Sequence, residues 1–396
     1  MTDPQTELVA GRARVREAMI AVSGRTQGVL PANGSVDQLD PAVVQDRRHD
    51  AVVELLRSAV NRPMLVIVED LHWADEASLS LLRRLAIATE RSPWLLVATA
   101  RPGSAALGDA AHERRVLEPL AGEGLGALAA RLALDANLLD SDVARLVERS
   151  GGNPLFLTEL ITAGRTDELP DTIEQLLAAR IDALPAWDRA LLRDVAVLGS
   201  TVELDLAAEV CEDIEVARPD RWSSLSAFVS IGETSLRFRH DLMRSVAYEG
   251  LAKRRRRDLH GRAADALAGK ADDTTRAVHL LRAERWADAW PVAARAATTA
   301  RAQGALADAA DLYAQAAAAT RRAQPAALDA SFELDAEHAD ALELLGRFPE
   351  AEMVLRRVAR TGPLAPRDRA RLARQTARVQ RRIGRFAAAL AWVTRG

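Results

Sequence analysis

The sequence predicts a short parallel α/β segment followed by a mostly α-helical chain that ends in helical repeats. Two runs of aliphatic residues flank an amphipathic pattern between residues 64 and 101, in the order strand, helix, strand. Aromatic residues make up only 4% of a chain that is 48% hydrophobic, and the abundant alanine, leucine and arginine favour helices. A short motif also recurs along residues 283–396. The length of 396 residues allows two or three domains.

The first aliphatic run, residues 65–68, ends in two adjacent carboxylates, Glu69 and Asp70. We expect a strand that is buried on both faces of a parallel sheet, because such strands are continuously apolar. Charges are then tolerated where the strand emerges at its carboxyl end, which is the edge where open α/β sheets bind ligands. One carboxylate there can hold Mg²⁺ and the other can orient a water molecule for attack on a phosphate. The alternative is an ordinary buried strand whose end is acidic.

A helix and a second strand follow at once. Asp75 fits the helix N-cap position, and apolar residues then recur at helical spacing until Ser92-Pro93 ends the helix. Residues 94–101 form the second aliphatic run, which Pro102-Gly103 terminates. One right-handed strand–helix–strand unit would bring Arg101 to the same edge as the two carboxylates. Arg101 could there sense a γ-phosphate, or it could simply be solvated.

A Gly-Gly-Asn-Pro segment at residues 151–154 follows two predicted short helices over residues 121–150. Asn153 suits a helix N-cap and Pro154 suits the first helical position, so a tight turn into a helix is a sufficient explanation of this segment.

The next stretch, up to residue 268, predicts helices, a short strand and a basic run. One helix begins at Asp171, a second covers residues 185–198, and a strand carries Leu236 and Phe238 before another helix. Lys253 and the four arginines that follow it are interleaved with acidic residues, which favours a solvated helical face over a nucleic-acid site. His240 and His260 lack companions at ligand spacing, so we expect no metal site there.

Four copies of one motif place a large apolar residue three positions before an alanine, in residues 283–297, 304–317, 346–358 and 384–396. The small alanine lets two helices approach closely, and the large residue fills the groove beside it. The last two anchors, Phe348 and Phe386, lie 38 residues apart (386 − 348), near the tetratricopeptide period of about 34. This pattern resembles a degenerate tetratricopeptide solenoid, and a generic alanine-rich bundle is the alternative.

The segments LVIVEDLHWADEASLSLLRRLA (65–86) and VERSGGNPLFLTELI (147–161) resemble the STAND (signal-transduction, AAA-related) ATPases of large bacterial regulators. The resemblance extends in order over most of residues 50–320. Members of this kind are fused to class III adenylate cyclase domains or to LuxR-type DNA-binding domains. The resemblance implies ATP and Mg²⁺ as cofactors. It gives Glu69 and Asp70 the catalytic and metal-binding roles and places Arg101 at the γ-phosphate. It also places Gly152, Asn153 and Pro154 near the adenine.

The resemblance also implies a fold in four regions. These are an N-terminal segment that is poorly ordered or partly helical, an α/β remnant of a P-loop ATPase sheet, a mostly α winged-helix region, and a truncated tetratricopeptide-like helical array. Their expected limits are residues 1–45, 46–120, 121–268 and 274–396.

The phosphate-cradling signature of that family has no match, because no segment fits G-x-x-x-x-G-K-[ST]. We therefore expect a fragment or a degenerate member of the family that has little ATPase activity of its own. An incomplete sheet would leave an uncovered edge and apolar surface, and the last repeat would leave a second apolar patch.

Two functions from different classes follow. The first is an ATP-dependent regulatory switch in signal transduction or transcription. The second is a non-catalytic scaffold that binds a protein partner through its C-terminal helical repeats, with self-association through the uncovered surfaces. The net charge of −3 argues against nucleic acid as a partner. The absence of an apolar run of membrane-spanning length argues against a membrane. The single cysteine, Cys211, is most simply a small buried hydrophobe, and a cytoplasmic location is expected.

Overall fold

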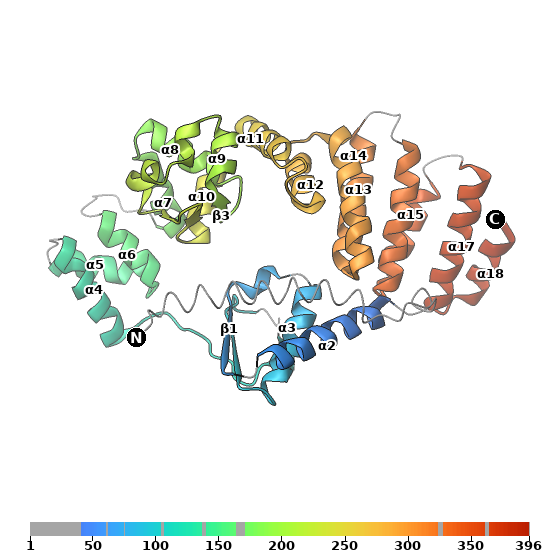
Figure 1. The fold of residues 1–396 in the computed structure, drawn as a ribbon, viewed down its shortest axis with the longest axis horizontal. Coiled ribbons are helices and arrows are strands. Elements are labelled where there is room, and N and C mark those ends of the chain that lie inside the picture. The colour runs from blue at the N-terminus through green and yellow to red at the C-terminus, as the bar shows by residue number, and fades with distance from the viewer. Residues whose placement is uncertain are drawn as a thin grey trace. The chain divides into compact units, whose positions relative to one another are not determined.

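The computed structural model describes residues 41–396 except 61, 75, 104–106, 137–139, 164–170, 324–327, 361–363 and 396. Its described residues are mostly helical with a few short strands (Figure 1). They divide into two compact units, of which one is Val116–Ala289 and the other combines the residues before and after it. No helix of the described part is both long and apolar enough to cross a membrane. The predicted N-cap Asp75 and the predicted N-terminal segment up to residue 40 lie outside the described residues.

The predicted strand–helix–strand unit is present. β1 (Met64–Val68) and β2 (Trp94–Ala98) pair in parallel in one register, with α3 (Glu76–Thr89) between them in sequence. α2 (Pro41–Ala59) crosses the limit expected at residue 45. Val53, Ala88 and Trp94 form the small core of this segment, in which α2 and α3 cover one face of the strand pair.

The other face of the strand pair is exposed, which makes the expectation of two buried faces wrong. Leu65, Ile67 and Leu95 are 58%, 59% and 60% exposed, and Val97 is 41% exposed. An apolar run cannot distinguish a strand covered on both faces from one covered on one face, because the covering layer comes from elsewhere in the chain. The expected uncovered apolar surface is therefore confirmed for the described residues, and self-association through it stays a prediction.

The second unit begins with three helices and continues into a mixed α and β region. α4 (Gly122–Ala136), α5 (Asp140–Ser150) and α6 (Pro154–Ala163) pack around Leu157 and Leu160, which are fully buried. The mixed region contains α7 (Ile173–Asp182), α8 (Ala186–Val195), β3 (Thr201–Glu203), α9 (Leu204–Cys211), β4 (Val229–Ile231), β5 (Ser235–Phe238) and α10 (Asp241–Glu249), with 3-10 turns at Ile214–Ala217 and Pro219–Leu225.

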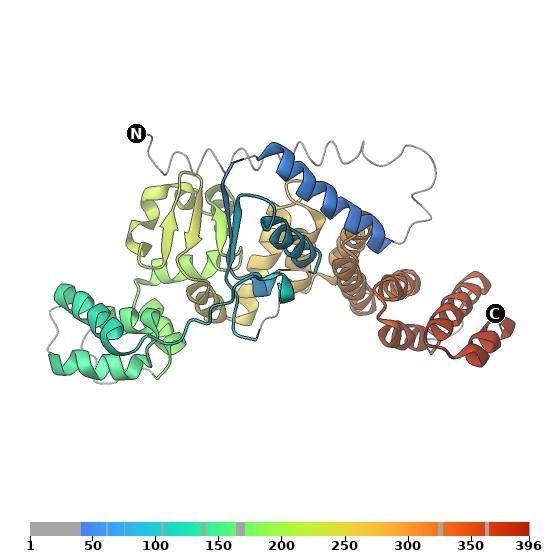
Figure 2. The same cartoon turned by 90° about the horizontal axis from the view of Figure 1, so that it is seen from below.

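The three strands form an antiparallel sheet in the order β3-β5-β4, which Figure 2 shows as yellow-green arrows. The predicted strand is β5, whose Leu236 and Phe238 are buried as expected. α7 begins at Ile173 rather than at Asp171, because the hydroxyl of Thr172 accepts a hydrogen bond from the Gln175 backbone N–H and caps the helix.

α11 (Lys253–Ala266) begins with the basic run, and α12 (Asp273–Arg282) follows it. Arg255 pairs with Asp194 at 2.5 Å, and both Lys253 and Arg257 pair with Glu284 at 3.6 and 3.2 Å. Three of the five residues of the basic run thus pair with carboxylates of their own unit, and the expectation that the run is not a nucleic-acid site stays a prediction.

The C-terminal helices, coloured orange to red in Figure 1, repeat one turn structure. They are α13 (Trp286–Gln303), α14 (Leu306–Arg322), α15 (Leu328–Leu344), α16 (Phe348–Val358), α17 (Pro366–Arg382) and α18 (Phe386–Arg395). Each anchor of the sequence motif is the first residue of its helix, and the residue two positions earlier has a positive φ of 58° to 85°. The next backbone N–H closes the same turn each time, by donating to the carbonyl five residues back.

The alanine of the motif is fully buried in the first three copies, at Ala289, Ala309 and Ala351. The repeated helical array is therefore confirmed. In the last copy Phe386, Leu390 and Val393 of α18 are 68%, 66% and 62% exposed, and these positions share one helical face. The sequence predicts a second apolar patch near Phe386 and Trp392, of which Phe386 is exposed and Trp392 is half-buried.

Candidate functional site

The carboxyl end of β1 carries the two acidic residues in a sharply turned backbone. Asp70 adopts the left-handed conformation with φ 55° and ψ 42°, which aspartate tolerates better than most residues. Its backbone N–H donates to the hydroxyl of Thr99 at 3.0 Å, and the N–H of Leu71 donates to the Thr99 carbonyl at 2.8 Å. The turn after β1 is thus fixed to the end of β2, and the side chains of Glu69 and Asp70 are left exposed.

Arg101 leaves β2 at the same sheet end, because Val68 and Ala98 are paired in the parallel register. The structure therefore brings Glu69, Asp70 and Arg101 to one edge, as the sequence predicts. Exposed carboxylates are the ligand type that Mg²⁺ prefers, so two of the three residues fit that ion chemically. Within the described residues, however, no three histidine, cysteine or acidic side chains cluster as a metal site.

The predicted Gly-Gly-Asn-Pro turn has a clear structural role in the other unit. The Asn153 side-chain oxygen accepts from the backbone N–H groups of Leu155 and Phe156 at 3.0 and 3.1 Å, and Pro154 is the first residue of α6. Gly152 has φ 80°, and a Cβ atom there would lie 2.4 Å from the Leu120 carbonyl oxygen. Gly152, Asn153 and Pro154 thus form a helix cap beneath a close backbone approach, which is the structural explanation that the sequence offered.

A groove in the helical array was not predicted as a site. It has a volume of about 820 Å³ and lies between α13 and α15, with Tyr313 of α14 contributing to its wall. The hydroxyls of Thr298 and Tyr313 lie 3.3 Å apart in it. Its lining is Trp290, Ala294, Thr298, Arg301, Ala302, Tyr313, Ala330, Glu333, Leu334, Glu337 and Leu344.

The charged residues of the groove are linked to one another. Glu333 and Glu337, one turn apart on α15, accept hydrogen bonds from Arg371 of α17 at 2.5 and 2.6 Å. Glu337 also pairs with Arg301 of α13. Each carboxylate is thus held in place by a guanidinium. The repeat motif indicates the helices that form the groove, but the groove residues fall outside the motif, so sequence inspection alone misses them.

A buried histidine pair was also missed. His260 of α11 and His279 of α12 are only 1% and 7% exposed, and their Nδ1 atoms lie 2.9 Å apart, so one ring donates to the other. The Tyr248 hydroxyl lies 3.0 Å from Nε2 of His260. Burial, together with the neighbouring His279 and Arg282, lowers the pKa of His260 to about 3, and burial together with Arg282 lowers the pKa of His279 to about 4. Both rings are neutral at pH 7 and join the two helices.

Comparisons with known proteins give limited matches. No family model matches the chain. It is 32% identical over 267 residues to an uncharacterized protein of Rhizobium meliloti (strain 1021), a match that includes 59% of this chain and 25% of the relative. Among solved structures it is similar, at a TM-score of 0.46 and 13% identity, to a STAND protein with a tetratricopeptide repeat sensor from Pyrococcus horikoshii. That similarity covers 88% of this chain and 57% of the other. The chain thus spans about a quarter of the curated relative, and its family stays a prediction from the sequence motifs.

Proposed function

We propose that the chain is a helical-repeat scaffold that binds a segment of another protein in the groove between α13 and α15. The observation that supports this most directly is the groove itself, whose volume of about 820 Å³ is in the usual range for binding sites. The half-buried Trp290 and Leu344 offer apolar surface, while the exposed Thr298, whose hydroxyl lies 3.3 Å from that of the buried Tyr313, offers a hydrogen bond. Such a combination suits a peptide that inserts one apolar side chain and hydrogen-bonds alongside it.

Ion pairing in the groove supports a preformed site. Because Arg371 joins both carboxylates of α15, and Arg301 joins Glu337 from α13, the side chains that border the groove are held before a ligand arrives. Preorganisation reduces the entropy lost on binding. The paired charges also leave little net charge, so the groove favours an uncharged or mixed segment over a highly charged one.

Peptides selected from a random display library against the purified chain provide the test. We expect peptides that bind with micromolar affinity and that bind Thr298→Trp at least tenfold more weakly, because the indole fills the groove. Thr162→Trp on α6 is the matched control, since Thr162 and Thr298 are both exposed helical threonines whose hydroxyl donates to the carbonyl four residues back. Selected peptides that bind Thr298→Trp and the wild-type chain equally would contradict the proposal.

A nucleotide-dependent switch of the STAND type is the second candidate function. The arrangement of Glu69, Asp70 and Arg101 at one sheet end supports it, and in this proposal the carboxylates would hold Mg²⁺ and Arg101 would approach the γ-phosphate. Control of a cyclase or of transcription would belong to the longer proteins that the motifs resemble. The missing phosphate-cradling sequence weighs against tight binding by this chain alone, because backbone N–H groups and a lysine normally supply the main phosphate contacts.

We expect Mg-ATP to bind with a dissociation constant above roughly 100 μM, which corresponds to less than about 5.5 kcal/mol of binding free energy. Isothermal titration calorimetry of the whole chain measures this directly. Asp70→Asn should leave so weak a signal unchanged. Low-micromolar binding that Asp70→Asn abolishes would instead establish a working nucleotide site.

A further inference from the structure

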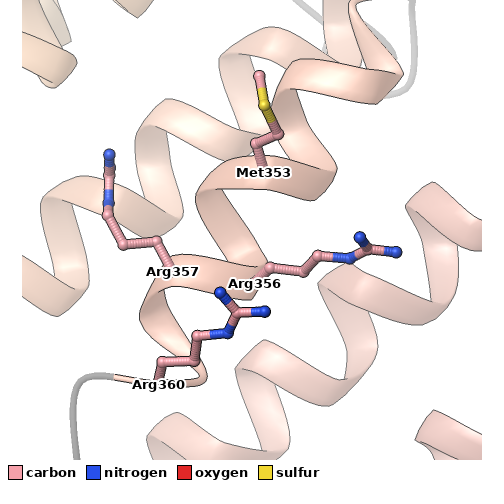
Figure 3. Close-up of a pocket in the computed structure, with 4 residues that line it drawn as sticks. All are labelled: Met353, Arg356, Arg357 and Arg360. Carbon is pink, nitrogen blue, oxygen red and sulfur yellow. The ribbon is translucent and has the colours of Figure 1, made fainter.

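The outward face of α16 and its C-terminal turn carry a shallow hollow of about 440 Å³ lined by Met353, Arg356, Arg357 and Arg360 (Figure 3). These four residues, which we call the α16 basic face, follow the spacing i, i+3, i+4, i+7 and therefore share one side of the helix. None of them lines the groove between α13 and α15, so this surface is separate from the proposed peptide groove.

One buried carboxylate serves two arginines at this face. Asp335 of α15 is 3% exposed and accepts from Arg357 at 2.7 Å and from Arg321 of α14 at 3.0 Å. A single negative charge therefore faces two positive charges, and one positive charge is left over.

The same imbalance occurs one turn away. Glu352 is 8% exposed and accepts from Arg356 at 2.5 Å and from Arg385 at 3.1 Å. Gln380 also donates to this carboxylate, at 2.7 Å, but adds no charge. Arg356 and Arg385 therefore share one carboxylate, and a second positive charge stays unneutralised.

Arg360 adds a third. It is exposed, and its guanidinium has no hydrogen-bonding or ion-pairing partner among the described residues. The helix dipole stabilises a cation near a helix C-terminus, which explains why an arginine is favourable at position 360. The dipole does not use the hydrogen-bond donors of the Arg360 guanidinium, which stay available. The face itself thus carries three arginines against the two carboxylates that it contacts. With Arg321 and Arg385, which share those carboxylates, five arginines surround two carboxylates and leave an excess of about three positive charges.

We propose that the α16 basic face is a docking surface for an acidic peptide segment of a partner protein. Guanidinium groups bind carboxylates through paired hydrogen bonds, and Arg356 and Arg357 of this face already bind carboxylates within the chain. Met353 is 64% exposed beside them and supplies a flexible apolar contact. The matching segment has two acidic residues next to an aliphatic one. Nucleic acid fits less well, because the affinity for nucleic acid depends on the number of phosphates neutralised and three arginines on one helix can neutralise only a few.

The test uses a fluorescein-labelled peptide with the repeating sequence Glu-Glu-Leu, and a second peptide with glutamine in place of every glutamate. Fluorescence anisotropy with the full chain should show binding of the acidic peptide only, with a dissociation constant that rises with NaCl concentration. Arg360→Glu should weaken binding at least fivefold, because it removes one donor group and adds a repelling charge. Since no described residue pairs with the Arg360 side chain, this variant should keep the wild-type circular dichroism spectrum and unfolding midpoint.

Arg254→Glu is the control for net charge, because Arg254 is an exposed arginine on α11 without a partner among the described residues. It should bind the acidic peptide as the wild-type chain does. Inorganic phosphate at 10 mM and a single-stranded oligonucleotide serve as competitors, and neither should displace the peptide at the ionic strength of the buffer. Equal binding by Arg360→Glu and Arg254→Glu, no binding by the wild-type chain at 200 μM, or displacement by the oligonucleotide at low concentration would each overturn the proposal.

Discussion

Ala351→Trp should lower the free energy of unfolding of the helical array by about 3 kcal/mol or more. Ala351 is fully buried at the start of α16, in one core with Leu342 of α15 and Leu372 of α17. An indole in place of a methyl group has no free volume to occupy, so α16 must move away from its neighbours. Inserted bulk in a well-packed core typically costs about 1–3 kcal/mol, and tryptophan for alanine is an extreme case.

Met353→Trp is the matched control, because it places the same side chain two residues later at a position that is 64% exposed. It should change stability by no more than about 0.5 kcal/mol. Urea unfolding followed by circular dichroism, together with hydrogen exchange of peptides from α15, α16 and α17, measures both variants. Equal and small effects at the two positions would show that the close approach at Ala351 does not hold the array together.

The repeat could be predicted from sequence because all its determinants are local. Three features define the repeat, and all lie within about ten residues of chain. They are a positive φ two residues before each anchor, a hydrogen bond that spans six residues, and an alanine three positions after the anchor. Glycine is the residue with the left-handed conformation in the last three copies. In the first copy Glu284 has this conformation, with φ 58°. The motif was recognisable there only because Trp286 and Ala289 keep their positions.

The sheet end could be predicted for the same reason. Strand, helix and strand follow one another directly in the sequence, and the parallel pairing of the two strands brings Glu69, Asp70 and Arg101 to one edge. The number of covered faces could not be predicted, because an aliphatic strand has the same sequence pattern whether one or two layers cover it. The sequence pattern therefore predicts that Leu65 and Ile67 are buried, whereas both are exposed in the described residues.

The groove and the histidine pair depend on contacts between separate helices. Residues that line the groove come from three helices and share no sequence pattern. His260 and His279 lie 19 residues apart on different helices, with no cysteine or carboxylate spacing to draw attention to them. His240 precedes His260 by 20 residues (260 − 240), at almost the same spacing, but the structure pairs His260 with His279 and Tyr248.

The histidine pair predicts acid sensitivity of the joint between α11 and α12. Both folded-state pKa values are lowered, to about 3 for His260 and about 4 for His279, from the ordinary value of 6.5. A group with a lowered pKa binds fewer protons in the folded state than in the unfolded state. Its contribution to stability is therefore complete above pH 6.5 and is lost as the pH falls from 6.5 towards the folded pKa. The expected loss is up to about 1.4 kcal/mol per pH unit for each histidine.

Protonation also breaks the contact itself, because two protonated rings would place N–H against N–H where one ring must accept. Hydrogen exchange of peptides from α11 and α12, measured between pH 6.5 and 5 and corrected for the intrinsic pH dependence of exchange, should show protection that falls steeply with pH. Acidic side chains that titrate at lower pH contribute little in this window. Burial also chiefly lowers the pKa values of His49 and His338, so these two residues contribute to the pH dependence of stability as well. A matched variant must therefore leave both of them unchanged.

His279→Asn is that variant. Its side-chain amide can replace Nδ1 as the partner of His260, but it does not titrate, and it leaves His49 and His338 unchanged. The variant should be less stable than the wild type at pH 7, because asparagine fills less of the buried space. It should nevertheless lose protection in α11 and α12 with about half the wild-type slope as the pH falls, because one of the two histidines is gone. A slope equal to that of the wild type would mean that the pair does not control the acid response of this joint, and that the background groups do.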